Sequence, residues 1–141
     1  MLIKTSNPGS GELQNVTAGD SLVYQRMGEI VENLGKGLEG KYGYTSVGAV
    51  IGATWPHEME DLRARMPHSF FLVPGYGAQG GTAEDVQYAF GPKGRGAIIN
   101  ASRSIMCAWQ KTGGDGHDFQ DAARAAAVAM RDAIGAYVKM D

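Results

Sequence analysis

The chain alternates between two kinds of segment, and this alternation limits the folds that are open to it. Four short apolar runs, rich in β-branched side chains, predict strands at residues 2–6, 46–53, 69–73 and 97–101. Segments with apolar residues at helical spacing lie between these runs and after the last one. Strands that alternate with helices are typical of parallel β/α units, so we expect an α/β fold with a parallel sheet.

The number of units narrows the architecture further. The 141 residues are 43% apolar and 20% charged, which suits one globular domain with its own core. A closed (β/α)8 barrel takes eight units and about 250 residues. Four β/α units therefore predict either a small open sheet or half of such a barrel, in a single domain that spans residues 1–141.

The ends and inner faces of the helices can be predicted as well. The first long helix should run over residues 20–34, with Thr17 as its N-cap. Thr54 is the expected cap after the second strand, and Thr82 with Asp85 resembles a capping box after the third. The residues expected to face the sheet from the first helix are Leu22, Val23, Met27, Ile30, Val31 and Leu34. A final helix over residues 118–139 repeats apolar side chains at Phe119, Ala123, Ala126, Met130, Ile134 and Tyr137.

Charge and composition argue against several classes of function. A net charge of −2 and a pI near 5.9 provide no overall basic field, so we expect neither nucleic acid nor a membrane as a partner. The single cysteine, Cys107, rules out an internal disulfide and has no neighbours at metal-ligand spacing. The amino terminus lacks the pattern of a signal peptide, and no apolar run approaches the ~20 residues that span a bilayer. The expected compartment is the cytoplasm.

The most informative motif follows the third predicted strand. Residues 74–81 read PGYGAQGG, and their four glycines lack the Cβ atoms that would keep backbone N–H groups away from an anion. Ser102 and Arg103 follow the fourth strand, and a guanidinium is a forked donor suited to phosphate. Residues 104–109 could form a short helix whose first N–H groups point at the same anion. These two loops therefore predict a shared phosphate site.

Two other interpretations of the same residues remain open. Gly75, Gly77 and Gly80 spell the G-x-G-x-x-G pattern of dinucleotide sites. However, the Thr82 cap delays the helix beyond the glycines, and no acidic residue ends the next strand to hold a ribose. The simpler alternative is that the glycines only form a turn and Arg103 only a surface ion pair. Because both features follow consecutive strands, a binding site is favoured.

Several of these segments together form a pattern found in one enzyme family. Residues 74–81, followed by a strand that leads into residues 102–105 (SRSI), resemble orotidine 5′-phosphate decarboxylase. Residues 4–8 (KTSNP) and 47–54 (VGAVIGAT) are similar to the longer bacterial subgroup of that family. The resemblance runs nearly from end to end. It implies a (β/α)8 barrel, usually a homodimer, that converts orotidine 5′-phosphate to UMP without a metal or an organic cofactor.

The resemblance also implies roles for individual residues. Gln79 is similar to the loop amide that contacts both the phosphate and the pyrimidine. Arg103 is similar to the phosphate arginine, with the Ser102 N–H beside it, and Ser6 matches the serine that hydrogen-bonds the pyrimidine. The glycine loop would be mobile and would close over the ligand. The substrate-binding residues implied in this way are Ser6, Pro74, Gly75, Gln79, Gly80, Ser102 and Arg103.

One part of the family's pattern is missing from these 141 residues. The family carries its chemistry on an Asp-x-Lys-x-x-Asp motif, and no lysine here has those flanking aspartates. The chain is therefore similar to the C-terminal half of the enzyme, strands five to eight, and we expect no catalytic residue in it. It would be inactive alone, with the N-terminal half or further copies of itself as partner. The alternative is a non-catalytic module that binds phosphosugars or nucleotides, or a half-barrel that self-assembles.

Overall fold

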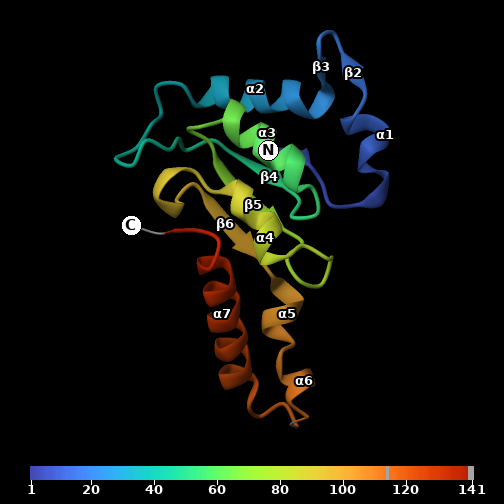
Figure 1. Cartoon of the computed structure of the whole chain (residues 1–141), viewed down its shortest axis with the longest axis vertical. Coiled ribbons are helices and arrows are strands. Elements are labelled where there is room, and N and C mark those ends of the chain that lie inside the picture. The colour runs from blue at the N-terminus through green and yellow to red at the C-terminus, as the bar shows by residue number, and fades with distance from the viewer. Residues whose placement is uncertain (114, 140–141) are drawn as a thin grey trace.

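The four predicted strands form one parallel sheet. The computed structural model describes residues 1–113 and 115–139, so positions 114, 140 and 141 of the predicted domain lie outside the described residues. The strands are β1 (Leu2–Lys4), β4 (Gly48–Ile51), β5 (Phe70–Pro74) and β6 (Ala97–Asn100). Their order is β1-β4-β5-β6, and every neighbouring pair is parallel (Figure 1). The predicted α/β fold with a parallel sheet is thus confirmed.

The two faces of the sheet differ in exposure. The register between strands aligns Leu2, Val50, Leu72 and Ile98 in a single row, which we call the open row. Leu2, Leu72 and Ile98 are 67%, 43% and 57% exposed. Phe71 and Val73, which alternate with Leu72 along β5 and so point to the opposite face, are fully buried. Helices therefore cover one face of the sheet and leave an apolar row on the other.

Helix α2 (Val23–Gly35) packs against β1, β4 and α3 (Pro56–Arg65), with only part of the predicted face turned inward. Its buried residues are Tyr24, Gly28, Val31 and Gly35. Ile30 and Leu34, which were expected to face inward, are 42% and 56% exposed. A Cβ atom on Gly28 would lie 2.8 Å from Leu62 Cδ2, so the missing side chain lets α3 approach. The predicted stripe is wrong at Ile30 and Leu34 because a glycine makes the close helix contact.

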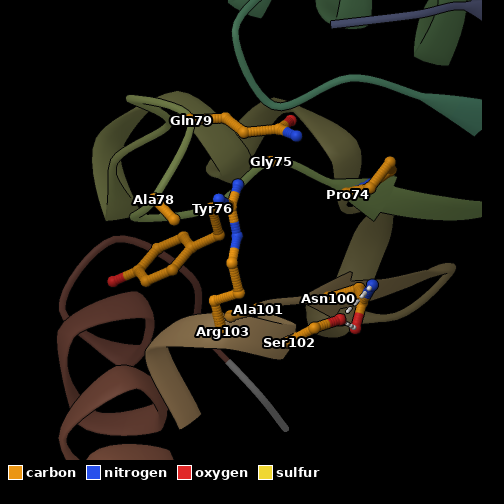
Figure 2. Close-up of a pocket in the computed structure, with 9 residues that line it drawn as sticks. All are labelled: Pro74, Gly75, Tyr76, Ala78, Gln79, Asn100, Ala101, Ser102 and Arg103. Carbon is orange, nitrogen blue, oxygen red and sulfur yellow. Dashed lines mark hydrogen bonds between the residues drawn. The ribbon is translucent and has the colours of Figure 1, made fainter. Parts of the chain in front are cut away.

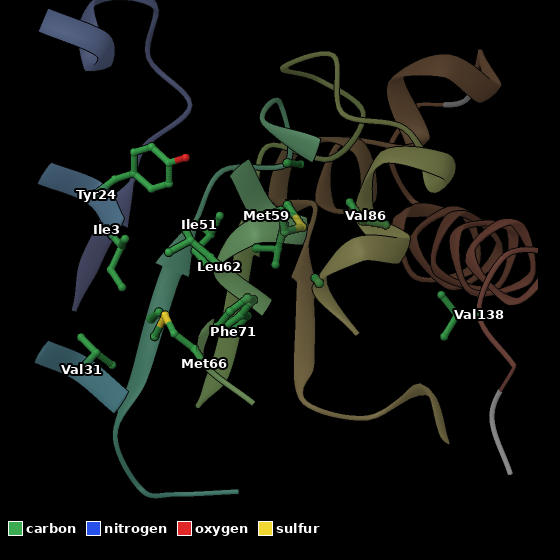
Figure 3. Close-up of a cluster of buried hydrophobic side chains, with 14 of the residues drawn as sticks. Ile3, Tyr24, Val31, Ile51, Met59, Leu62, Met66, Phe71, Val86 and Val138 are labelled. Atoms are coloured by element: carbon green, nitrogen blue, oxygen red, sulfur yellow. The ribbon is translucent and has the colours of Figure 1, made fainter. Parts of the chain in front are cut away.

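The core lies between these helices and the sheet. Met59, Leu62 and Met66, which belong to α3 or directly follow it, are fully buried. Figure 3 shows Leu62 and Met66 near Phe71 of β5, within the buried cluster that also includes Val31 of α2. This packing fixes the positions of β4 and β5, and the carboxyl end of β5 leads into the glycine loop.

The segment between β1 and α2 contains elements that the sequence did not predict. They are the 3-10 turn η1 (Pro8–Ser10), the short helix α1 (Gly11–Gln14), and an antiparallel hairpin of β2 (Thr17–Ala18) and β3 (Ser21–Leu22). Thr17 pairs with Leu22 in this hairpin, so the prediction of Thr17 as a helix N-cap is wrong. Strands of two residues are too short for the alternation from which a strand is predicted.

Of the two other predicted helix caps, one is confirmed. The Thr82 hydroxyl accepts from the Asp85 N–H, and the Asp85 carboxylate accepts from the Thr82 N–H, at the start of α4 (Ala83–Val86). Thr54 is not a cap, because α3 begins two residues later and the Thr54 hydroxyl has no partner among the described residues. Two 3-10 turns, η2 (Gln87–Ala89) and η3 (Pro92–Gly94), connect α4 to β6.

Three helices follow β6 and extend away from the sheet (Figure 1). They are α5 (Ser102–Met106), α6 (Trp109–Thr112) and α7 (Phe119–Gly135), and α7 packs against both of the others. The short helix expected at residues 104–109 begins two residues earlier, and the final helix ends at Gly135. Its predicted stripe is wrong at both ends, because Phe119 and Tyr137 are half exposed while Val138 is buried.

A partly buried guanidinium lies at the amino ends of the strands. Arg63 of α3 donates to the backbone carbonyl oxygens of Met66, Ser69, Ala89 and Gly96 at 2.8–3.0 Å. Its Cζ lies 3.6 Å from the centroid of the Phe71 ring. Burial lowers the pKa of Arg63 to about 10, so the side chain stays charged at neutral pH. Since Ser69 and Gly96 directly precede β5 and β6, this side chain ties the starts of two strands to α3.

Candidate functional site

A cavity of about 140 Å³ lies at the carboxyl ends of β5 and β6. Its lining residues are Pro74, Gly75, Tyr76, Ala78, Gln79, Asn100, Ala101, Ser102 and Arg103 (Figure 2). The loops after two neighbouring strands thus meet, as their places in the sequence predict. Five of the seven expected substrate-binding residues line the cavity, whereas Ser6 and Gly80 do not. Tyr76 and Asn100 were not among the expected residues, although both adjoin the motifs.

The glycine loop is a compact turn with internal hydrogen bonds. Gly75, Gly77 and Gly80 have φ values of 100°, 72° and 99°, in the left-handed region that favours glycine. The Gly77 N–H donates to the Gly81 carbonyl at 2.8 Å, and the Gly80 N–H donates to the Gly77 carbonyl at 2.9 Å. These N–H groups stabilise the turn itself. The loop therefore presents the Gln79 side chain to the cavity, while the Gly80 N–H is used within the turn.

The second loop presents Arg103 and the first turn of α5. Because α5 begins at Ser102, the N–H groups of Ser102 and Arg103 lie in its first turn, where no carbonyl of the same helix can accept them. Figure 2 shows the Arg103 side chain extending toward the glycine loop and Gln79. None of the ion pairs in the described part of the chain involves Arg103. A surface ion pair therefore does not account for its position.

A third segment reaches the cavity through Gln79. Ser6 is the last residue of the first predicted strand and lies two residues beyond β1, and its hydroxyl donates to Gln79 Oε1 at 2.7 Å. The two residues are 73 positions apart in the sequence. The bond uses the amide oxygen, so the Gln79 Nε2 group remains available as a donor to an anion. Ser6 thus stands next to the cavity without lining it, and Gln79 joins it to the site.

A buried lysine lies beside this segment and was not predicted from the sequence. Lys4 is fully buried, and its Nζ donates to Asn15 Oδ1 at 2.7 Å. The same Nζ lies 4.3 Å from the centroid of the Trp55 ring. Burial lowers the pKa of Lys4, an effect that the nearby Glu58 charge partly offsets. A lysine at the end of an apolar strand was the available signal, but its partners could not be read from the sequence.

The chemistry of the cavity favours binding an anion. Its lining supplies a guanidinium, amide and hydroxyl groups and backbone N–H groups, with no carboxylate or imidazole. Across residues 1–113 and 115–139 there is no group of three His, Cys, Asp or Glu side chains that could hold a metal ion. No helix within the same ranges has the length and apolar character needed to cross a membrane. The arrangement suits a phosphate ester better than general acid–base catalysis.

Comparison with known proteins places this geometry in context. No protein-family model matches the chain. The orotidine 5′-phosphate decarboxylase of Rhodopirellula baltica is 44% identical over an alignment of 138 residues, which covers 95% of this chain and 46% of the relative. The structure of Leishmania donovani UMP synthase matches with a TM-score of 0.71 and 34% identity, covering 95% of this chain and 26% of that one. Leishmania donovani OMP decarboxylase matches with a TM-score of 0.68 and 31% identity, covering 94% and 46%.

These matches explain the open sheet. The chain spans about half the length of the curated relatives it matches. The similar structures are (β/α)8 barrels, and the four-stranded sheet corresponds to about half of such a barrel, as expected. The order of strands and the two loops at their carboxyl ends agree with this correspondence. The chain is homologous to the C-terminal half of the orotidine 5′-phosphate decarboxylases.

Proposed function

We propose that residues 1–141 act as one half-barrel unit that binds orotidine 5′-phosphate and its product UMP. In this proposal, Arg103 and the N–H groups of Ser102 and Arg103 hold the phosphate. Gln79 contacts both the phosphate and the pyrimidine, and Ser6 hydrogen-bonds the pyrimidine. The observation that best supports the proposal is the Ser6–Gln79 hydrogen bond, made at the edge of the cavity that also contains Arg103.

Phosphate binding would act on the reaction from a distance. Pro74 and Gly75 begin the loop that would close over the ligand, and Gly80 lies within it. Closure would exclude water and align the reacting carbon, so binding energy at the phosphate would lower the barrier to decarboxylation. A lysine that protonates the product carbanion must come from outside these residues, because they lack the Asp-x-Lys-x-x-Asp motif. The unit itself needs neither a metal nor an organic cofactor, and we place it in the cytoplasm.

Removal of the Arg103 guanidinium tests the phosphate assignment. We expect Arg103→Ala to weaken UMP binding by roughly 1.5–3 kcal/mol, the usual worth of a hydrogen bond to a charged group. Binding of uridine, which lacks the phosphate, should not change. Isothermal titration calorimetry on the purified 141-residue chain gives both affinities.

The control for this experiment is Arg124→Ala, which removes an exposed guanidinium of α7 outside the cavity. UMP binding should be the same in this variant and in the wild type. Equal affinities of the wild type and Arg103→Ala for UMP would contradict the phosphate role of Arg103. Failure of the wild-type chain to bind UMP at all would contradict the proposed function as a whole.

A second proposal concerns the partner that completes the barrel. The open row is exposed on the uncovered face of the sheet, and β1 and β6 are edge strands. On α2, Ile30 and Leu34 are exposed as well. These surfaces suit another half-barrel, either an N-terminal half or a second copy of the chain. We favour a second copy for the purified chain, because β6 of each copy could then pair with β1 of the other and remove both edges.

Sedimentation and a direct assay test this second proposal. We expect the purified chain to sediment as a species larger than the 15.0 kDa of one chain, and Leu72→Glu to shift it toward the monomer. Neither species should release CO2 from orotidine 5′-phosphate. A well-behaved wild-type monomer would contradict self-association, and appreciable CO2 release would contradict the requirement for a lysine from outside the chain.

A further inference from the structure

The residue before Ser6 is held by side chains on three of its polar groups. The Thr5 N–H donates to Gln14 Oε1 at 3.1 Å, and Gln14 Nε2 donates to Thr5 Oγ1 at the same distance. The Thr5 carbonyl accepts from the indole N–H of Trp55 at 2.7 Å. Thr5 directly follows the edge strand β1, where backbone groups often bond only to water. We call Gln14 and Trp55 the Thr5 anchor.

The anchor is itself held in place from two directions. Gln14 is the last residue of α1, and Asn15, which follows it, accepts a hydrogen bond from the buried Lys4 ammonium. The face of the Trp55 ring lies against the same ammonium, while the ring edge donates to Thr5. Lys4 thus connects the two arms of the anchor, which come from the β1–α2 segment and from the segment between β4 and α3. The Thr5 backbone is fixed relative to both.

Ser6 has no room to move toward β4. A Cβ atom on Gly52 would lie 2.8 Å from Ser6 N and 3.0 Å from Ser6 Cα. The Gly52 N–H also donates to the Lys4 carbonyl at 2.7 Å, the last backbone bond between β1 and the β4 segment. Gly52 therefore sets how closely Ser6 approaches the end of β4. With Thr5 anchored on one side and Gly52 below, the Ser6 hydroxyl is directed at Gln79.

We infer that Gln14, Trp55 and Gly52 are positioning residues for the nucleobase side of the site. They do not line the cavity, and they act by fixing the backbone on either side of the Ser6 Cα so that Ser6 and Gln79 stay paired. The inference rests on the proposed binding of UMP. A group held in one geometry before the ligand arrives binds with less loss of conformational freedom, so loosening the anchor weakens nucleotide binding. Binding of inorganic phosphate, which does not need Ser6, is unaffected.

A double-mutant cycle between Trp55 and Ser6 tests this coupling. Trp55→Phe keeps an aromatic ring near Lys4 but removes the N–H that donates to Thr5. We expect it to lower UMP affinity about fivefold, which is the usual effect of losing one neutral hydrogen bond. In a Ser6→Ala background the same change should have less than about a twofold effect, because no hydroxyl remains to be positioned. Calorimetry on the full chain gives the UMP affinities, and NMR titration with orthophosphate gives the phosphate affinity, which should stay constant.

Matched controls separate positioning from general damage. Trp109→Phe makes the same substitution in α6, outside the cavity lining, and should leave both affinities unchanged. Gly52→Ala, whose Cβ would meet Ser6 backbone atoms, should lower UMP affinity about tenfold and also spare phosphate. Gly135→Ala, at a helical position with open space around it, is its control.

The outcomes separate this inference from the proposed function. If the wild-type chain binds no UMP, the proposed function fails and the positioning inference fails with it. If it binds UMP but Trp55→Phe has the same effect with and without Ser6, only the positioning inference is overturned. Unchanged UMP affinity in both Trp55→Phe and Gly52→Ala, or a parallel loss of phosphate affinity, overturns it as well.

Discussion

Two cations at opposite ends of the sheet, the partly buried Arg63 and the fully buried Lys4, are held in different ways. At the amino ends of the strands, Arg63 donates to four backbone carbonyls and lies against an aromatic ring. At the carboxyl end of β1, Lys4 is fully buried, yet it makes one side-chain hydrogen bond among the described residues, to Asn15. The rings of Trp55 and Tyr24, whose centroids lie 4.3 and 5.5 Å from Nζ, complete its surroundings.

The difference indicates that the two ends of the sheet serve different purposes. Backbone carbonyls are fixed parts of the fold, so Arg63 stabilises the sheet itself. The partners of Lys4 are side chains from the segments that follow β1 and β4 and from α2, close to Ser6 at the edge of the candidate site. In complete (β/α)8 barrels the carboxyl ends of the strands carry function, while the amino ends serve stability. In this half-barrel the candidate cavity likewise lies at the carboxyl ends, and the Arg63 contacts lie at the amino ends.

Loss of Arg63 should produce the largest effect on stability. Arg63→Ala leaves the carbonyls of Ala89 and Ser69 without their buried donor, and we expect the free energy of unfolding to fall by about 3 kcal/mol or more. Urea denaturation followed by tryptophan fluorescence gives the change. UMP affinity of the protein that remains folded should be unchanged, because Arg63 lies at the other end of the strands.

The control is a neighbouring arginine on the same helix. Arg65 pairs with Asp61 and Glu29, but its side chain is 36% exposed, so Arg65→Ala should cost no more than about 1 kcal/mol. Similar losses of unfolding free energy in Arg63→Ala and Arg65→Ala would show that Arg63 stabilises the fold no more than an exposed arginine does. A large loss of UMP affinity in Arg63→Ala would show that the amino ends of the strands also affect ligand binding.

Features that depend on local patterns could be predicted from the sequence, whereas contacts between distant residues could not. The strands, the glycine loop and Arg103 carry local patterns, and the parallel sheet brings the two loops together without further information. Gln14 and Trp55 could not be predicted as an anchor, because Thr5 meets them across 9 and 50 residues of sequence. No short-range period marks such a contact.

Part of the inner face of α2 was mispredicted for a related reason. Periodicity rewards large apolar side chains, so it selected Ile30 and Leu34. The helix instead turns Gly28 toward α3, where an absent side chain allows close packing against Leu62. Ile30 and Leu34 are left exposed on the outer side of the half-barrel, and a pattern drawn from one sequence cannot tell an inner apolar face from one that meets a partner.

The smallest effect on stability should come from Lys4. Lys4→Met keeps a long apolar stem and removes a charge that burial disfavours, so at pH 7 the free energy of unfolding should stay within about 1.5 kcal/mol of the wild type. The effect should therefore be clearly smaller than that of Arg63→Ala. A loss as large as that of Arg63→Ala would show that the two cations contribute equally to stability.

The pH dependence of the free energy of unfolding provides a second test of Lys4, because burial lowers the pKa of Lys4 below its ordinary value of 10.5. Between the lowered pKa and 10.5 the unfolded chain binds more protons at this lysine than the folded chain does, so wild-type stability should rise with pH in that window. Lys4→Met should lack this rise. Burial also raises the pKa of Tyr24, which lowers stability above pH 10 in both proteins, so the Lys4 effect is taken from the difference between them. Urea denaturation of both proteins at several values between pH 7 and pH 10.5 gives the difference in their free energies of unfolding. A difference that stays constant with pH would mean that the pKa of Lys4 is the same in the folded chain as in the unfolded chain.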